Sequence, residues 1–172
     1  MDVTHIPEFG KLKYVHVTID TYSGFIFATL HSGEASKNII AHVFQCLTVM
    51  GKPQKIKTDN GPGYTSQAFQ TFCHQFQIKH ITDIPYNPQG QGIVERAHQT
   101  LKNTINKLKT NDIYSTKGSP HNILNHALFT LNFLQLDNKE NSAADRLWHQ
   151  ETKNQYAVGT GLAQWIELRP VD

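Results

Sequence analysis

The sequence predicts a mixed α/β fold, in which an antiparallel hairpin forms one edge of a sheet and later strands add in parallel. Three observations support this prediction. Residues 14–19 (YVHVTI) alternate apolar and polar side chains, as a half-buried strand does. Over residues 34–50 the apolar spacing changes to that of a helix, and two segments, 93–109 and 120–136, carry long apolar helical stripes. A chain of 172 residues is long enough for one domain with a substantial core.

The first part of the chain predicts three antiparallel strands. Residues 1–6 (MDVTHI) form the first, joined through PEFGK to the strand at 14–19. The turn DTYSG at 20–24 then leads into a strand at 25–30 (FIFATL). The last two strands make a hairpin, and the first pairs alongside it.

Helices and short strands alternate over the next fifty residues, which is the order that gives parallel strands. The helix at 34–50 ends before Gly51 and Pro53. A strand at 54–59 (QKIKTD), a helix at 66–76 and a strand at 78–82 follow. The apolar positions of the two helices are Ile39, Ile40, Val43, Phe44, Leu47, Phe69, Phe72, Cys73 and Phe76.

The remaining elements are a loop and helices. Residues 83–92 (DIPYNPQGQG) are rich in Pro, Gly, Asn and Gln and predict a mobile loop. Strong helices follow at 93–109 and 120–136, and Ser142 caps a last short helix to about His149.

The composition limits the classes of function. At 38% hydrophobic and 17% charged residues the chain is globular, and no apolar run of about 18 residues occurs, so we expect no membrane partner. Cys46 and Cys73 each lie in a helical pattern and are expected to be buried thiols rather than a disulfide. The net charge is only +2, so a domain like this would borrow DNA affinity from flanking domains or partner subunits.

Two carboxylates border turn-forming or glycine-rich segments. In KTDNGPGYTS (57–66), Asp59 stands where a strand ends, although Asp-Asn-Gly is also a common turn sequence. Glu95 lies in the first turn of a helix, where an acidic residue is favoured by the helix dipole alone. Glu95, Gln99 and Lys102 fall within roughly 60° of one another on the face away from the apolar stripe.

A third carboxylate cannot be chosen from the residues alone. Asp2 and Asp20 both flank strands of the hairpin system. Asp20 ends a regular strand, but it also opens DTYSG, where an Asx turn is expected. Asp2 is almost terminal, and chain termini usually fray.

Three stretches resemble the motifs of one family: MDVTH at 1–5, TDNGPGYTS at 58–66 and IPYNPQGQGIVERAHQTLK at 84–102. They are similar to the catalytic core of retroviral integrases, above all those of betaretroviruses and their endogenous relatives. The resemblance runs over residues 1–150 and leaves 151–172 as a tail of uncertain structure. It implies a ribonuclease-H-like fold, a mixed five-stranded sheet flanked by helices, which agrees with the element order.

The resemblance implies a metal site. In the family three carboxylates hold two divalent ions, Mg²⁺ or Mn²⁺, and the matching residues are Asp2, Asp59 and Glu95. One ion activates the attacking oxygen and the other stabilises the leaving oxygen of a phosphodiester. Asp20 matches a position outside the site, which resolves the choice in favour of Asp2. His5 and Asn60 match neighbours of the site.

The resemblance also implies contacts with DNA. Lys102 matches a lysine that contacts viral DNA near the cut end, and Tyr86 and Gln91 match positions on the DNA-contacting loop. His98 and Gln99 stand where many integrases carry Asn and Lys, so their role in target contacts is open.

The activity implied is that of a polynucleotidyl transferase, which trims the 3′ ends of viral DNA and joins them to host DNA. The expected partners are viral DNA ends, host target DNA and further copies of the chain, in a homodimer or higher multimer formed through helices 34–50 and 120–136. The expected location is the virion, then the host cytoplasm and nucleus.

Two alternatives remain. A ribonuclease H or another nuclease of the same fold is disfavoured by the GQG loop that precedes the Glu95 helix. An inactive, domesticated module that only assembles is disfavoured by the intact Asp2, Asp59 and Glu95. Neither the His/Cys zinc domain nor the basic barrel of full integrases is seen, so the sequence is expected to be an excised core.

Overall fold

The computed structural model describes residues 1–82, 91–110 and 118–149. Three antiparallel strands form its first sheet: β1 (Asp2–His5), β2 (Tyr14–Ile19) and β3 (Ile26–His31). The short helix η1 (Pro7–Leu12) joins β1 to β2. The predicted three-stranded antiparallel unit is therefore confirmed, with β3 shifted by one residue from the prediction.

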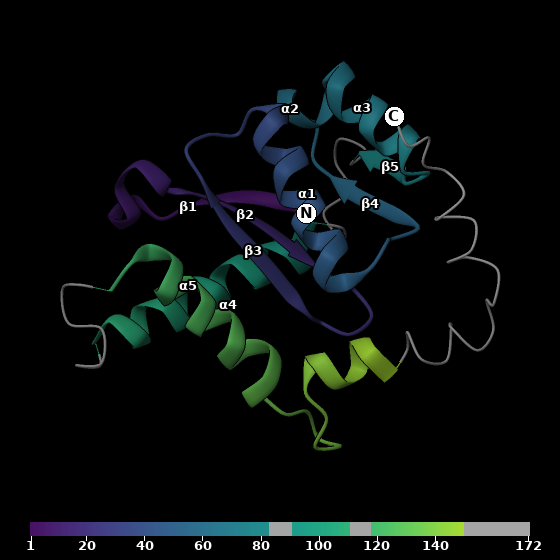
Figure 1. The fold of residues 1–172 in the computed structure, drawn as a ribbon. Coiled ribbons are helices and arrows are strands. Elements are labelled where there is room, and N and C mark those ends of the chain that lie inside the picture. The colour runs from purple at the N-terminus through teal and green to yellow at the C-terminus, as the bar shows by residue number, and fades with distance from the viewer. Residues whose placement is uncertain (83–90, 111–117, 150–172) are drawn as a thin grey trace.

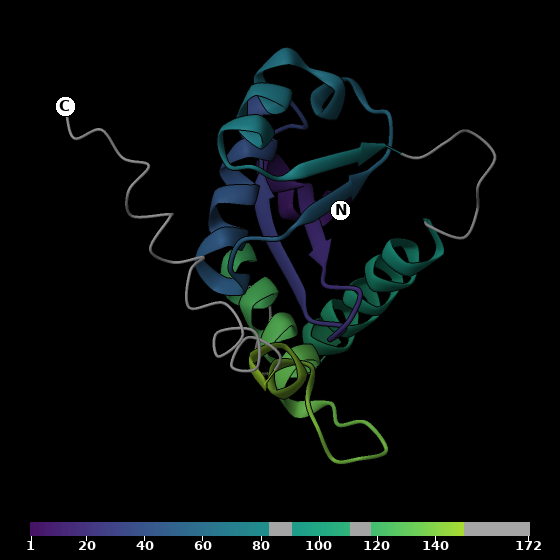
Figure 2. The same ribbon diagram turned by 90° about the vertical axis from the view of Figure 1, so that its right-hand side faces the viewer.

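The second sheet has two parallel strands, β4 (Lys55–Thr58) and β5 (Lys79–Thr82). Three helices accompany it: α1 (Ser36–Met50) precedes β4, and α2 (Pro62–Thr65) and α3 (Gln67–Gln75) lie between β4 and β5. The Met1 amino group donates to the Lys57 carbonyl at 2.6 Å, so β1 and β4 adjoin at the seam between the sheets. The two sheets lie edge to edge in Figure 2.

Helices cover both faces of the antiparallel sheet (Figure 1). On one face α4 (Gln91–Thr110) and α5 (Pro120–Phe129) pack against it, because their apolar side chains share a core with β2 and β3. On the other side α1 and α3 enclose a second core with β4, to which Met1 and Val3 also contribute. The members of the first core include Val15, Val17, Ala28, Leu30, Ala97, Leu101, Ile105, Leu124 and Ala127.

The helix predicted at 120–136 ends differently. The α-helical part stops at Phe129 and continues as a π-helical turn, η3 (Thr130–Leu134), in which Gln135 N–H donates to Thr130 O. Within this turn Asn132 is buried and bonds both peptide groups of Ile26 on β3. Apolar periodicity predicts the helix but carries no signal for this widened turn.

Other local predictions can be compared directly. Ser142 caps the helix at 143–149, because its hydroxyl accepts from Asp145 N–H while Asp145 Oδ2 accepts from the Ser142 N–H and hydroxyl. Cys46 and Cys73 are buried and free, as predicted. The predicted loop at 83–92 is too long at its end, since α4 begins at Gln91; residues 83–90 and the tail at 150–172 lie outside the described residues. No helix in the described part of the chain is long and apolar enough to cross a membrane.

Candidate active site

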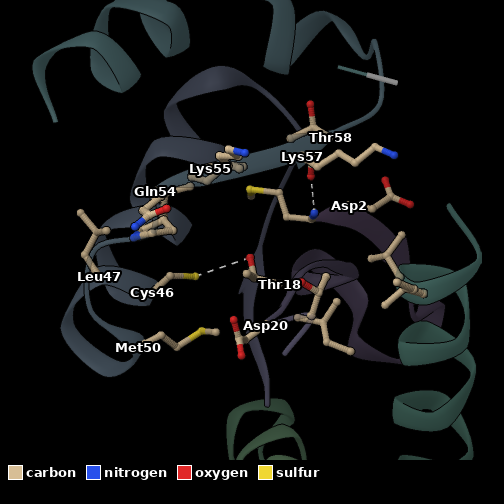
Figure 3. A pocket seen from close by; sticks show the side chains of 18 of the residues that line it. Asp2, Thr18, Asp20, Cys46, Leu47, Met50, Gln54, Lys55, Lys57 and Thr58 are labelled. Atoms are coloured by element: carbon tan, nitrogen blue, oxygen red, sulfur yellow. Dashed lines mark hydrogen bonds between the residues drawn. The ribbon is translucent and has the colours of Figure 1, made fainter. Parts of the chain in front are cut away.

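A groove of about 700 Å³ contains all of the predicted metal ligands. Asp2 comes from β1, Asp59 follows β4, and Glu95 lies near the start of α4. These elements are far apart in sequence, and the groove is the place where they meet. Asp20 also lines it, well separated from Asp2 in the view of Figure 3.

The Asp2 carboxylate is held on one side and open on the other. Its Oδ1 accepts the N–H of Val3 at 2.7 Å. Its Oδ2 lies 3.9 Å from Nδ1 of His98, a residue of α4. The strand β1 therefore fixes the backbone of Asp2, and α4 places the His98 ring beside its second oxygen.

Asp59 combines the turn chemistry and the groove position that the sequence left as alternatives. Its Oδ1 accepts the N–H of Gly61 at 2.9 Å, which is an Asx-type turn. A Cβ at Gly61 would lie only 3.0 Å from that same oxygen, so a side chain there would crowd the carboxylate. In the described part of the chain Oδ2 of Asp59 accepts no hydrogen bond, and the residue lines the groove.

Tyr64 connects the two aspartates electrostatically. It is buried in α2, and its hydroxyl has no hydrogen-bond partner among the described residues. Burial raises the pKa of Tyr64, and the negative charges of Asp2, Asp59 and Glu34 raise it further. Both aspartates must therefore lie close enough to this hydroxyl for their charges to act on it.

The charges of Asp2 and Glu95 both act on His98. Burial lowers the pKa of His98, while the charges of Asp2 and Glu95 oppose the shift and that of Lys102 adds to it. The imidazole is therefore held neutral near pH 7. Glu95 itself is exposed on the helix surface.

The carboxylates share the groove without closing into a tight cluster. Over residues 1–82, 91–110 and 118–149, no three His, Cys, Asp or Glu side chains are grouped closely enough to hold a metal ion. Like charges without a cation between them repel, which favours such separation. The donor set nevertheless fits a divalent ion of the magnesium type, because it consists of carboxylate oxygens from three different elements.

Asp20 is occupied by its turn, as the DTYSG motif predicts. Its Oδ2 accepts the Ser23 N–H at 2.7 Å and the Ser23 hydroxyl at 2.6 Å. Gly24, at φ +76°, completes the turn into β3. The carboxylate of Asp20 is thus committed to the hairpin.

The predicted DNA-contacting and neighbouring residues separate into groups. Gln99 and Lys102 lie on α4 with Glu95, and Gln99 donates to Asn103 at 2.8 Å. His5 pairs with Glu34 at 2.9 Å and is not among the residues that line the groove. Asn60 is exposed beside Asp59, Gln91 is the first residue of α4, and Tyr86 lies outside the described residues.

A hydrogen-bond chain that the sequence does not reveal adjoins the groove. His42 of α1 is fully buried, with Nε2 2.8 Å from the Thr18 hydroxyl and Nδ1 2.7 Å from the Thr29 hydroxyl. The Thr29 hydroxyl also contacts Nε2 of His31 at 2.8 Å. Cys46, which lines the groove, donates to Thr18 (Figure 3). His42 is therefore a buried core residue whose two ring nitrogens both have hydrogen-bond partners.

Comparison with known proteins identifies the family. The sequence model of the family described as integrase core domain matches residues 1–88 of the chain. The HTLV-2 integrase catalytic core domain, solved in complex with magnesium in a dimeric form, is 35% identical with a TM-score of 0.72; the alignment covers 85% of this chain and 92% of that one. The chain belongs to the retroviral integrase core family.

Regions of betaretroviral polyproteins are also similar in sequence to this integrase core. The Gag-Pro-Pol polyprotein of Simian retrovirus SRV-1 is 63% identical over 158 residues, which is 92% of this chain and 9% of the relative. That of Mouse mammary tumor virus is 56% identical over 148 residues, 86% of this chain and 8% of the relative. The chain thus spans about a tenth of these polyproteins.

Among solved structures, the simian T-cell lymphotropic virus intasome in complex with the PP2A regulatory subunit B56 gamma is also similar to this integrase core. The match has a TM-score of 0.74 and 34% identity, and covers 85% of this chain and 52% of that one. The ribonuclease-H-like fold predicted from the motifs is therefore confirmed.

Two features of the site were missed from the sequence. Tyr64 lies inside the quoted motif GPGYTS, and a tyrosine five residues after Asp59 was the available signal. His98 was considered only for DNA contacts, whereas its ring lies against Asp2. Its position three residues after Glu95 places both on one helix face, which was the signal for it.

Proposed function

We propose that residues 1–150 act as a metal-dependent polynucleotidyl transferase, which processes viral DNA 3′ ends and transfers them into host DNA. The observation that carries the proposal is the groove, to which Asp2, Asp59 and Glu95 each contribute from a separate element. Two Mg²⁺ or Mn²⁺ ions bound by these carboxylates would supply Lewis-acid activation of the nucleophile and stabilisation of the leaving oxygen.

The chain's own residues prepare this site. Asp2 and Asp59 each use one oxygen to accept a backbone N–H, which orients the other oxygen for a cation. His98 is neutral near pH 7, so it does not neutralise Asp2 with a full positive charge. Exposed Glu95 is the carboxylate with the most freedom to adjust to an ion.

The surface of α4 is the proposed DNA contact. Lys102 lies two helical turns beyond Glu95 and would contact a phosphate, while His98 and Gln99 lie between them. Gln91 and Tyr86 remain predicted contacts of the same DNA end. Contacts of this kind orient the substrate at the carboxylates without specifying its sequence.

We further propose that copies of the chain associate through α1 and α5. Phe44 on α1 and Phe129 on α5 are 46% and 51% exposed, and exposed apolar side chains that gather into a patch mark protein–protein interfaces. Phe129 also stacks on Phe133, with ring centroids 5.4 Å apart. Related HTLV-2 cores have been solved in dimeric and trimeric forms.

Light scattering tests this association. The chain should elute as a dimer or larger species at high micromolar concentration, and Phe129→Lys should shift it toward the monomer. Lys107→Glu reverses a charge on α4 and serves as the control. A wild-type chain that is monomeric at these concentrations would refute the proposal.

The relatives are regions of Gag-Pro-Pol polyproteins, which supports a location in the virion and, after entry, in the host cytoplasm and nucleus. The alternative is an inactive assembly module that keeps the three carboxylates without turnover, and a direct assay of activity separates the two.

The decisive assay uses a branched DNA that mimics the joined product. With Mn²⁺ the chain should resolve the branch, and Asp2→Asn, Asp59→Asn and Glu95→Gln should each abolish the reaction. Asp20→Asn keeps the turn and should leave the rate within a few fold. A chain that resolves no branched DNA and shows no rise of melting temperature with Mn²⁺ would be the inactive module.

A further inference from the structure

The end of β4 is bonded to the ring of His80 on the neighbouring strand β5. Nε2 of His80 lies 2.8 Å from the Thr58 hydroxyl, and Nδ1 lies 2.9 Å from Nε2 of Gln70 on α3. The ring packs edge-on against Phe69, with the ring centroids 5.0 Å apart. His80 therefore joins the last residue of β4 to the helix that follows residues 59–66.

The two partners of His80 each hold one end of the segment 59–64. The Thr58 hydroxyl donates to the Asp59 carbonyl at 2.8 Å. Gln70 Nε2 donates to the Tyr64 carbonyl at 3.1 Å. The backbone of the segment is thus bonded at its first and its last residue to side chains that meet at one imidazole ring.

The conformation of this segment sets the direction of the Asp59 carboxylate. Oδ1 of Asp59 accepts the N–H of Gly61, and the carbonyl of Gly61 accepts the N–H of Tyr64 at 3.0 Å. A Cβ at Gly63 would lie only 2.5 Å from the backbone oxygen of Glu34, so the segment also packs closely against the connection between β3 and α1. Release of either end would therefore loosen the carboxylate.

The four contacts fix the tautomer of His80. Thr58 has one hydroxyl hydrogen, which it donates to Asp59, so it accepts the N–H of His80 Nε2. Nδ1 is then the acceptor for Gln70, whose amide nitrogen has a second hydrogen for the Tyr64 carbonyl. A hydrogen on Nδ1 would break this bond or turn the amide away from Tyr64. Burial lowers the pKa of His80, which favours the neutral ring that the contacts require.

We propose that His80 is a positioning residue for Asp59, because its ring, through Thr58 and Gln70, fixes the segment from which this carboxylate would meet a divalent ion. Hydrogen-bond partners behind a metal ligand orient it, and their loss typically weakens metal binding by about 10–100-fold. Here the partner acts on the backbone around the ligand. The inference rests on the proposed function in taking Asp59 as a metal ligand.

Mn²⁺ titration of the full chain by calorimetry tests this role. His80→Phe keeps a ring against Phe69 but removes both nitrogens, and it should raise the Kd for Mn²⁺ by about tenfold. His80→Gln retains one donor and one acceptor and should restore most of the affinity. His74→Phe is the matched control, because His74 is exposed on α3, and it should bind Mn²⁺ as the wild-type chain does. A residue that only stabilised the fold would lower the melting temperature and leave the Mn²⁺ affinity unchanged, which would overturn the proposal.

A second variant releases the other end of the segment. Gln70 is exposed on α3, so Gln70→Ala preserves the fold even where His80→Phe does not. Without metal, hydrogen exchange of the Gly61 amide should be faster by about tenfold in Gln70→Ala. Gln75→Ala, at another exposed position of α3, should leave this exchange unchanged.

Long-range ¹H–¹⁵N NMR of the wild-type chain reads the tautomer of His80 directly. Nε2 should carry the hydrogen and Nδ1 should carry none. A ring that is mainly protonated at Nδ1 would overturn the proposal. A wild-type chain that binds no Mn²⁺ would refute the proposed function instead; faster exchange at Gly61 in Gln70→Ala would then still uphold the hold on the segment, and unchanged exchange would overturn it.

Discussion

Replacing Asn132 with alanine should destabilise the fold strongly, because this side chain satisfies both peptide groups of Ile26. Asn132 is 3% exposed, and its two hydrogen bonds to Ile26 measure 2.9 and 2.7 Å. Alanine would leave one N–H and one carbonyl of an outer strand unpaired. Each buried, unpaired group costs about 1–3 kcal/mol, so the free energy of unfolding should fall by about 2–6 kcal/mol. At about 3 °C per kcal/mol for a chain of this size, the melting temperature should drop by roughly 6–18 °C.

Urea denaturation followed by circular dichroism measures this change, with Asn103→Ala as the matched control. Asn103 is exposed on α4, so its replacement should change stability by less than about 0.5 kcal/mol. Asn132→Asp keeps an acceptor for Ile26 N–H but loses the donor, and it should recover stability at acid pH, where a protonated carboxyl can donate again. An Asn132→Ala chain as stable as the control would show that water or a shifted backbone satisfies Ile26.

Three further changes test the packing around the site. Burial holds the pKa of His42 well below 6.5 and lowers that of His31 to about 4. As the pH falls, the unfolded chain therefore takes up protons before the folded one, so the urea midpoint should be steady above pH 6.5 and fall between pH 6.5 and 4. A midpoint that does not change over this range would contradict the prediction. Gly63→Ala places a Cβ 2.5 Å from the backbone oxygen of Glu34 and should lower the free energy of unfolding by about 1–3 kcal/mol. An unchanged melting temperature would contradict this. Ser142→Ala removes the cap of the last described helix and should cost about 1 kcal/mol, with Ser142→Thr as the control that retains it.

Most of the fold was predictable because its strands and helices follow their periodicities. The strand at 14–19 has the bounds predicted from its alternation, and α4 and α5 follow apolar stripes that pack onto it. The sequence predicted one five-stranded sheet, whereas the strands form a three-stranded and a two-stranded sheet. Whether β1 and β4 pair depends on backbone contacts such as that between Met1 and Lys57, which side-chain pattern does not encode. The π-helical turn at Asn132 was not predicted for a similar reason, since the Asn132 side chain bonds to Ile26, which is 106 residues away in the sequence.

The site was predictable only in part. Their places at a strand end and in the first turn of a helix made Asp59 and Glu95 candidates, and the resemblance to integrases was needed to assign them to a metal site and to prefer Asp2 over Asp20. The hydrogen bonds from Ser23 to Asp20 agree with the Asx turn predicted from DTYSG. The burial of Tyr64 and the approach of His98 to Asp2 depend on tertiary packing, and the sequence signalled them only through their spacing from Asp59 and Glu95.

The close contact at Gly63 affects how variant libraries of this chain should be interpreted. Gly61 and Gly63 are two residues apart, yet a side chain added at Gly61 would crowd the carboxylate of Asp59, whereas one added at Gly63 would crowd the backbone between β3 and α1. A library scored only for DNA integration would report both as intolerant and would suggest a single catalytic motif. A parallel score for the abundance of folded protein would separate them, because only variants of Gly63 should disappear from the cell. Comparing the two scores at these glycines would then distinguish selection for folding of the chain from selection for its chemistry.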